Sequence, residues 1–323
     1  MSVGVNLQGN FPISRQRELA REAEAAGVDS LWTNDSLARD PFLLCQAWAD
    51  ATARLEVGIG VAQIATRTPA QLAKAAATLQ ESSGGRLLLG LGVSQPFAME
   101  QWHGVSVRKP LATARDALAI LRASFAGGPT DHRGAALSSV GFRLDMEPLP
   151  PPPPLYLGAM KPRMLALAGA EADGVLLSWE SCDGVHRAVE TARRAAEKAG
   201  RPAPRVAGYV RVAVAADAAA ARAALAREIA DYWRYYAGHF AGQGLEDEVA
   251  RGDEVFRLGG AAALAAALDD RILDALGWHG TADDGLPAVL DRYREAGLDR
   301  VVAYLVPVGD PEESFRLLLQ SLA

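Results

Sequence analysis

Ser83-Gly84-Gly85-Arg86-Leu87-Leu88-Leu89-Gly90-Leu91-Gly92-Val93-Ser94-Gln95-Pro96 is the stretch from which the fold of this chain can be predicted. Its apolar run over 86–91 is bounded by a glycine pair and by Ser-Gln-Pro, which is typical of a strand buried on both faces. Gly90 and Gly92 remove side chains where this strand ends, so a flat or bulky group could lie there against bare backbone. A β-bulge or a tightly packed barrel interior explains the same glycines.

A second pattern recurs along the whole chain. In residues 18–32, 165–177 and 290–304, an Ala-rich helical segment is followed by small and acidic residues and then at once by an apolar strand. The glycine in each joint is available to end the helix. The recurrence predicts one repeating α/β architecture.

The pattern of apolar runs predicts eight strands, over 3–7, 30–33, 55–61, 86–91, 155–157, 174–178, 206–213 and 300–305. Helices are expected over 14–26, 41–53, 69–82, 110–126, 162–171, 183–199 and 311–322, with a helical block over 217–296. Eight strands that alternate with helices predict a (β/α)8 TIM barrel over residues 1–323 as a single domain. A doubly wound sheet is the alternative.

Two segments interrupt this alternation. Residues 127–154 are rich in Gly, Ser and Pro and end in five prolines at 150–154, which predicts an extended insertion with polyproline character, either a linker or a lid. Residues 216–276 are too long for one crossover helix, so we expect a helical insertion after strand seven. Its aromatic cluster around Tyr232 and Tyr236 is typical of a core, although an insertion here would lie over the barrel mouth.

Composition limits the partners and the compartment. The chain has 323 residues, 50% of them hydrophobic, and a net charge of -6, so it has no basic excess for binding nucleic acid or an anionic membrane. Its two cysteines, Cys45 and Cys182, are far apart, which gives no support to a disulfide framework or a metal site. No leader or membrane-span pattern is seen, so a cytoplasmic location is expected.

The predicted strand ends carry hydrogen-bonding groups and bare backbone. They hold Asn34-Asp35-Ser36, Gln63, Gly92-Val93-Ser94-Gln95, Gly158-Ala159-Met160-Lys161 and Ser178-Trp179-Glu180. Paired carboxylates suited to hydrolysis are absent from these strand ends, where Asp35 and Glu180 are the only acids. The sequence contains no HExxH, P-loop or GxSxG motif. Such strand ends suit a bound cofactor that performs the chemistry itself. The residues before Pro162 could hold a phosphate at a helix N-terminus, or form a plain turn with a solvated lysine.

The order and spacing of several stretches resemble the bacterial luciferase-like flavin and deazaflavin oxidoreductases. The similar stretches are 26–35, 67–79, 83–94 and 157–159 leading to 172–174. The sequence Leu89-Gly90-Leu91-Gly92-Val93-Ser94, followed by Trp102-His103-Gly104, is most similar to that of the family branch that uses coenzyme F420, a deazaflavin that transfers hydride. The resemblance implies a (β/α)8 barrel with the ring of the cofactor at the carboxyl mouth.

The resemblance also implies which residues surround the cofactor. Asp35 would approach the polar edge of the ring, and Gly60-Val61, followed by Gln63, would form a bulge that is often a non-proline cis peptide. Gly92 and Ser94 would lie beside the ring. The cofactor phosphate would be surrounded by Gly158, Ala159, Met160, Lys161 and Ser178.

Two departures bear on the reaction. Sugar-phosphate-oxidising members carry a His after the Asp and a Glu after the strand-four glycines, where this chain has Ser36 and Gln95. Neither is an efficient acid or base at neutral pH, so reduction of an activated alkene, imine or carbonyl fits better. The catalytic residues stay open, with Asp35, Ser36, Gln95 and His103 as candidates. Conceivable proton donors are His103, His239 and Tyr209.

Three functions follow. The first is an F420-dependent oxidoreductase that moves hydride to or from a small organic substrate. The second is an FMN-dependent monooxygenase supplied with reduced flavin by a reductase, and the third is a cofactor-free ligand-binding barrel. The resemblance further implies a homodimer.

Overall fold

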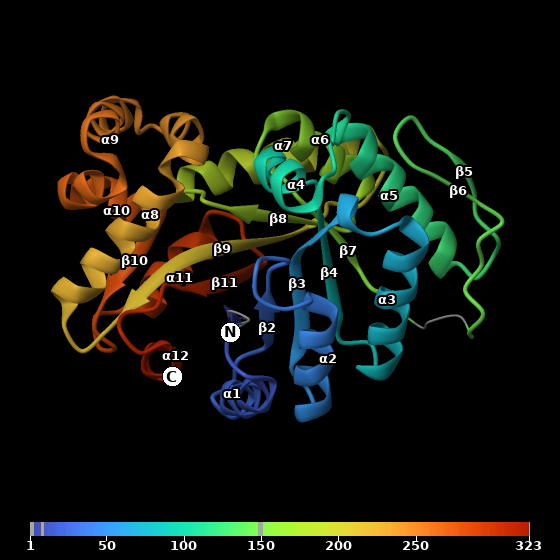
Figure 1. The fold of residues 1–323 in the computed structure, drawn as a ribbon, viewed down its shortest axis with the longest axis horizontal. Coiled ribbons are helices and arrows are strands. Elements are labelled where there is room, and N and C mark those ends of the chain that lie inside the picture. The colour runs from blue at the N-terminus through green and yellow to red at the C-terminus, as the bar shows by residue number, and fades with distance from the viewer. Residues whose placement is uncertain (1–2, 8–9, 148–150, 323) are drawn as a thin grey trace. The chain divides into compact units, whose positions relative to one another are not determined.

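The computed structural model describes residues 3–7, 10–147 and 151–322 of the chain (Figure 1). It divides into two compact units. Unit 1 comprises Met1–Leu7, Leu177–Val189 and Val206–Ala323, and unit 2 comprises Gln8–Leu176 and Glu190–Arg205. Each unit is built from parallel strands joined by helices, and each is described separately below.

In unit 2, parallel strands follow one another in chain order. They are β2 (Ser30–Thr33), β3 (Glu56–Gln63), β4 (Leu87–Gly92), β7 (Leu155–Gly158) and the start of β8 (Gly174–Ser178). The helices of this unit are α1 (Ile13–Ala25), α2 (Pro41–Ala51), α3 (Pro69–Ser82), α4 (Pro96–His103), α5 (Pro110–Phe125) and α6 (Pro162–Glu171), with η1 (Ile64–Thr66) as a short 3-10 turn. In Figure 1, α2 and α3 run alongside β3 and β4.

Local sequence explains where these helices begin. The Asp40 carboxylate accepts hydrogen bonds from the N–H groups of Phe42 and Leu43, and Thr68 accepts one from Gln71, so each side chain caps a helix. A proline in the first turn of five of the unit's helices costs no hydrogen bond there, because that N–H has no partner inside the helix.

In unit 1, four parallel strands stand in the order β10-β9-β11-β1. Their bounds are β1 (Val3–Asn6), β9 (Arg205–Val214), β10 (Gly277–Gly280) and β11 (Arg300–Leu305). The helices are α8 (Ala218–Ala241), α9 (Glu246–Ala267), α10 (Asp270–Leu276), α11 (Leu286–Glu295) and α12 (Pro311–Ser321), and α7 (Cys182–Lys198) begins in this unit. Helices α8, α9 and α10 occupy the predicted insertion over 216–276, and α8 packs on α9 and β10.

The eight strands expected from the sequence are all present, and those over 30–33, 174–178 and 300–305 have the predicted bounds. The helical block predicted over 217–296 is wrong at 277–280, where β10 pairs with β9. Helix α4, over Pro96–His103, was also not anticipated. Both elements are short, so their residues show too little periodicity to be recognised.

The insertion at 127–154 contains an antiparallel hairpin, β5 (Asp131–Arg133) with β6 (Ser138–Val140), which the extended prediction lacked. Asp116 on α5 holds this hairpin. Its buried carboxylate accepts hydrogen bonds from Ala136 N at 2.8 Å and Leu137 N at 2.9 Å, and it lies 3.0 Å from His132 Nε2. Of the five prolines predicted to be polyproline-like, Pro150 lies outside the described residues. Among the described helices, none is both long and apolar enough to cross a membrane.

Candidate active site

Strand β3 carries an irregularity near its carboxyl end in unit 2. The peptide between Gly60 and Val61 is cis, and the register with β4 shifts between Ile59 and Ala62. The bulge and the cis peptide that the resemblance implied are therefore confirmed. The bulge turns the side chain of Val61, which is half-buried, toward the glycines of the neighbouring strands.

Three strand-end glycines make room for this bulge. A Cβ built on Gly92 would lie 2.3 Å from Val61 Cγ2, and one on Gly158 would lie 2.9 Å from Val61 Cγ1. A Cβ on Gly90 would lie 2.5 Å from the carbonyl oxygen of Ile59. The β-bulge explanation of the glycines is confirmed. The space beside them holds β3 itself, with the side chain of Val61 packed toward Gly92 and Gly158.

Asp35 follows β2 and fixes the end of β3. Its N–H donates to Val61 O at 3.3 Å, and its carboxylate accepts from Gln63 N at 3.1 Å and from Arg67 Nη1 at 2.5 Å. Arg67 also donates to Asp40 Oδ2 at 2.7 Å. The carboxylate of Asp35 is thus already engaged within the protein, and its role in this structure is to position the residues around it.

Gln63 provides the unsatisfied group of this cluster. Its side-chain Nε2 donates to Asp35 O at 2.8 Å, whereas its Oε1 is buried and has no hydrogen-bond partner in the described structure. A buried acceptor without a partner is costly, so such atoms often mark a ligand site. The structure therefore brings together Asp35, Gly60, Val61, Gln63, Gly92 and Gly158.

The other predicted residues of unit 2 lie in the loops after strands or on α4, with different surroundings. Ser94 has a φ of 58°, and both Ser94 and Gln95 are half-buried before α4. Ser36 and His103 are exposed. Ala159 is buried and donates its N–H to Leu176 O at 3.1 Å, Met160 is half-buried, and Lys161 is exposed at the start of α6.

Ser178 belongs to unit 1, where it meets a residue that the sequence analysis missed. Arg211 on β9 is only 4% exposed, and its Nη1 donates to Ser178 Oγ at 2.8 Å. Its guanidinium carbon lies 3.7 Å from the ring centroid of Trp179 and 4.5 Å from that of Tyr304. Trp179, with a φ of 61°, is held in a backbone conformation that non-glycine residues seldom adopt.

The conceivable proton donors differ in their surroundings. His239 Nε2 lies 3.1 Å from the buried carboxylate of Glu180. Tyr209 is buried with its ring edge-on to Tyr304, at 5.5 Å between centroids. His103 is exposed in the last turn of α4. Of these two histidines, His239 is the one that lies beside a carboxylate in the described structure.

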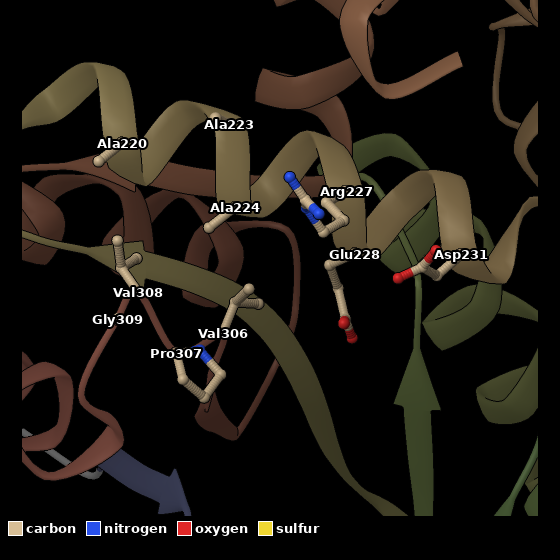
Figure 2. Close-up of a pocket in the computed structure, with 10 residues that line it drawn as sticks. All are labelled: Ala220, Ala223, Ala224, Arg227, Glu228, Asp231, Val306, Pro307, Val308 and Gly309. Atoms are coloured by element: carbon tan, nitrogen blue, oxygen red, sulfur yellow. The ribbon is translucent and has the colours of Figure 1, made fainter. Parts of the chain in front are cut away.

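Unit 1 also has a cavity of about 420 Å³ between α8 and residues 306–309, which follow β11. Figure 2 shows the side chain of Glu228 extending from α8 toward the side where Val306 and Pro307 lie, whereas the guanidinium of Arg227 points the other way. Burial raises the pKa of Glu228, Arg211 opposes this, and Asp231 adds to it. The cavity is thus lined by two acidic residues, Glu228 and Asp231, by Arg227 and otherwise by small and apolar residues.

Comparison with known proteins identifies the family and the fold. The model of the family described as luciferase-like monooxygenase matches residues 2–300. A 5,10-methylenetetrahydromethanopterin reductase of Methanolobus tindarius is 29% identical over 97% of this chain and 96% of its own. The coenzyme F420-dependent tetrahydromethanopterin reductase structure from Methanopyrus kandleri covers 99% of this chain and 97% of its own, with 23% identity and a TM-score of 0.83.

A further similar solved structure is an F420-dependent secondary alcohol dehydrogenase in complex with an F420-acetone adduct. The likeness has a TM-score of 0.77 at 17% identity and covers 99% of this chain and 97% of the dehydrogenase chain. These likenesses confirm the predicted (β/α)8 barrel. The family match and the reductase relative also confirm that the protein is an oxidoreductase. The chain belongs to the luciferase-like monooxygenase family.

Proposed function

We propose that this protein is an F420-dependent oxidoreductase that transfers hydride between the deazaflavin and a small organic substrate, an alkene, imine, carbonyl or alcohol. The relatives support the cofactor, because a reductase named as F420-dependent shares the fold over nearly the whole chain. The observation that carries the proposal is the cluster at the end of β3, where Gln63 Oε1 is a buried acceptor without a partner.

The residues of this cluster fit a deazaflavin ring. Such a ring has a polar edge with an N–H group and a broad face. Gln63 Oε1 can accept the hydrogen bond of that N–H, and the isopropyl group of Val61 offers an apolar surface for the face. When bound, F420 supplies a carbon that gives or takes a hydride.

The protein's own residues would act by position. Arg67 and the backbone N–H of Gln63 hold the carboxylate of Asp35, and Asp35 O in turn holds the Gln63 amide, so the acceptor is fixed before any ligand arrives. A pre-organised acceptor avoids the entropy of ordering a mobile side chain on binding. Ser36 and Gln95 offer no acid or base of suitable strength, so the proton must come from another group or from water.

Titration of the protein with F420, followed by the fluorescence of the deazaflavin, tests the proposal. Gln63→Leu should weaken F420 binding by about tenfold, because the lost hydrogen bond to a buried acceptor is worth about 1.4 kcal/mol. Gln71→Leu, at an exposed position on α3, is the matched control and should leave binding unchanged. Equal affinity of Gln63→Leu and wild type would contradict the placement of the ring.

An FMN-dependent monooxygenase is the second candidate, and the description of the family supports it. Such an enzyme would take reduced FMN from a separate reductase and react with O₂. Parallel titration with FMN separates the two, since the proposal requires that F420 bind at least tenfold more tightly than FMN. Binding of neither cofactor would favour a cofactor-free ligand-binding barrel.

A further inference from the structure

Arg211 in unit 1 is a buried cation without an ionic partner. It is 4% exposed, and it takes part in none of the ion pairs between described residues. Its one side-chain hydrogen bond goes to Ser178 Oγ, and its Nε has no partner in the described structure. Buried charges in proteins are as a rule paired, so this guanidinium has unused capacity for an anion.

The surroundings of Arg211 hold the cation but leave its charge uncompensated. The rings of Trp179 and Tyr304 lie over the guanidinium and stabilise it through their π faces. Tyr232 and Tyr236 on α8 continue the aromatic wall, with centroids 5.4 and 5.9 Å from that of Trp179. Tyr232 is 36% exposed, which marks the side of the cluster nearest to solvent.

Among the described carboxyl groups whose pKa is shifted, Glu228 is the one that Arg211 affects. Arg211 lowers the pKa of this carboxyl and Asp231 raises it, but burial dominates and raises it overall. Glu228 lines the cavity beside residues 306–309 and forms no ion pair with Arg211. It is therefore not an ion-pair partner of Arg211. Arg227, the cation that lines the cavity, points away from Glu228 (Figure 2).

We propose that Arg211 and Ser178 form an oxyanion-binding site for the carboxylate or phosphate of a small organic ligand. The planar guanidinium can donate two parallel hydrogen bonds to such a group. The hydroxyl of Ser178 accepts from Arg211 and keeps its own proton to donate. The aromatic wall favours a ligand whose anionic group is attached to a flat or conjugated body. This site stands on unit 1 alone and does not rest on the proposed cofactor.

Isothermal titration of the full-length protein with benzoate and with phenyl phosphate tests this site, with benzamide as the uncharged analogue of benzoate. At least one anion should bind the wild type at concentrations up to about 10 mM, and benzamide should bind at least about tenfold more weakly. Arg211→Met should weaken anion binding about tenfold or more, whereas Arg227→Met, which alters the cavity-lining arginine, should change it less than about twofold.

Two further variants keep the test decisive if Arg211→Met does not fold. Arg211→Lys keeps the charge and should retain part of the affinity, and Glu228→Gln removes the competing carboxyl and should tighten binding by about twofold or more. Anion binding that survives Arg211→Met, or equal binding of benzoate and benzamide, would overturn the assignment. The same would follow if neither anion bound the wild type.

The source of the anion is identified by competition. If saturating F420 displaces the bound benzoate or phenyl phosphate, the site takes an anionic group of the cofactor. If both bind together, the site takes an independent ligand. Either result supports an oxyanion site at Arg211, and the failure of F420 to bind at all would contradict the proposed function without affecting this inference.

Discussion

The contact between Val61 and Gly92 can be tested by adding a single methyl group. In Gly92→Ala the new Cβ would lie 2.3 Å from Val61 Cγ2 and 3.0 Å from Val61 Cβ. Carbon atoms in contact prefer about 3.5 to 4.0 Å, so the substitution cannot be accommodated without moving β3. Overpacking of this kind costs about 1–3 kcal/mol, and the severe overlap places Gly92→Ala at about 3 kcal/mol.

Val61→Ala should relieve most of this cost, because it removes both methyl groups nearest the new Cβ. Alone, Val61→Ala should cost about 1 kcal/mol, since the side chain is half-buried. The double variant should then lose about 2 kcal/mol, where simple addition would give about 4 kcal/mol, so the coupling between the two sites is about 2 kcal/mol.

Urea unfolding of the wild type, the two single variants and the double variant measures this coupling. Gly128→Ala is the control, because a Cβ at Gly128 would meet no atom within 4 Å, and it should change the free energy of unfolding by less than about 0.5 kcal/mol. If the double variant loses the full sum of the single effects, Val61 does not pack against Gly92 as described, and the explanation of the strand-end glycines fails.

Three further predictions concern charged side chains of unit 2. Asp116→Asn should destabilise the hairpin over 131–140 by about 2 kcal/mol, which would be seen as faster amide hydrogen exchange there. Burial raises the pKa of Asp116, but its hydrogen bonds to the hairpin lower that pKa overall. The stabilisation is therefore present above the usual pKa of an aspartate and is lost as the pH falls through the lowered pKa. Glu24→Gln should lower the free energy of unfolding in urea by about 1–2 kcal/mol, because the carboxylate accepts the N–H groups of residues 53–55, and unchanged stability would contradict this role. Arg67→Met should weaken F420 binding, because it frees the Asp35 carboxylate that positions Gln63. The loss of affinity should be at least as large as the loss of stability indicated by the fall in unfolding temperature. Unaltered affinity would show that this positioning is dispensable.

The strands were predictable where their own residues carry the signal. The strand over 30–33 lies between a helix-ending glycine and a polar loop, so both its ends can be recognised. The hairpin in 127–154 was missed because its strands are short, polar and mostly exposed, and because Asp116, 15 or more residues earlier, holds it. Strand β10 depends likewise on its pairing with β9. Propensity over four residues cannot outweigh such tertiary contacts.

The residues of the candidate site were likewise predictable in part from the sequence and in part only from the structure. The positions of Asp35, Gly60 and Val61 came from a resemblance, and the bulge there is present. Only the structure shows that Arg67 engages the Asp35 carboxylate and that Gln63 Oε1 is the acceptor without a partner. A sequence specifies which polar groups are available at a strand end. Which of them are already satisfied depends on distances of a few tenths of an ångström.

Arg211 shows that a search of strand ends alone is too narrow. Strand β9 reads Arg-Val-Ala-Gly-Tyr-Val-Arg-Val-Ala-Val, and Arg205 at its start is exposed, as a charge at a strand end should be. Arg211 lies within the apolar part of the strand and shares a face with Tyr209, because alternate residues point the same way. A charge at such a position is costly unless something compensates it. Its presence in the sequence was therefore already a signal. The two rings over its guanidinium and its Nε without a partner in the described structure are the observations on which the proposed anion site rests.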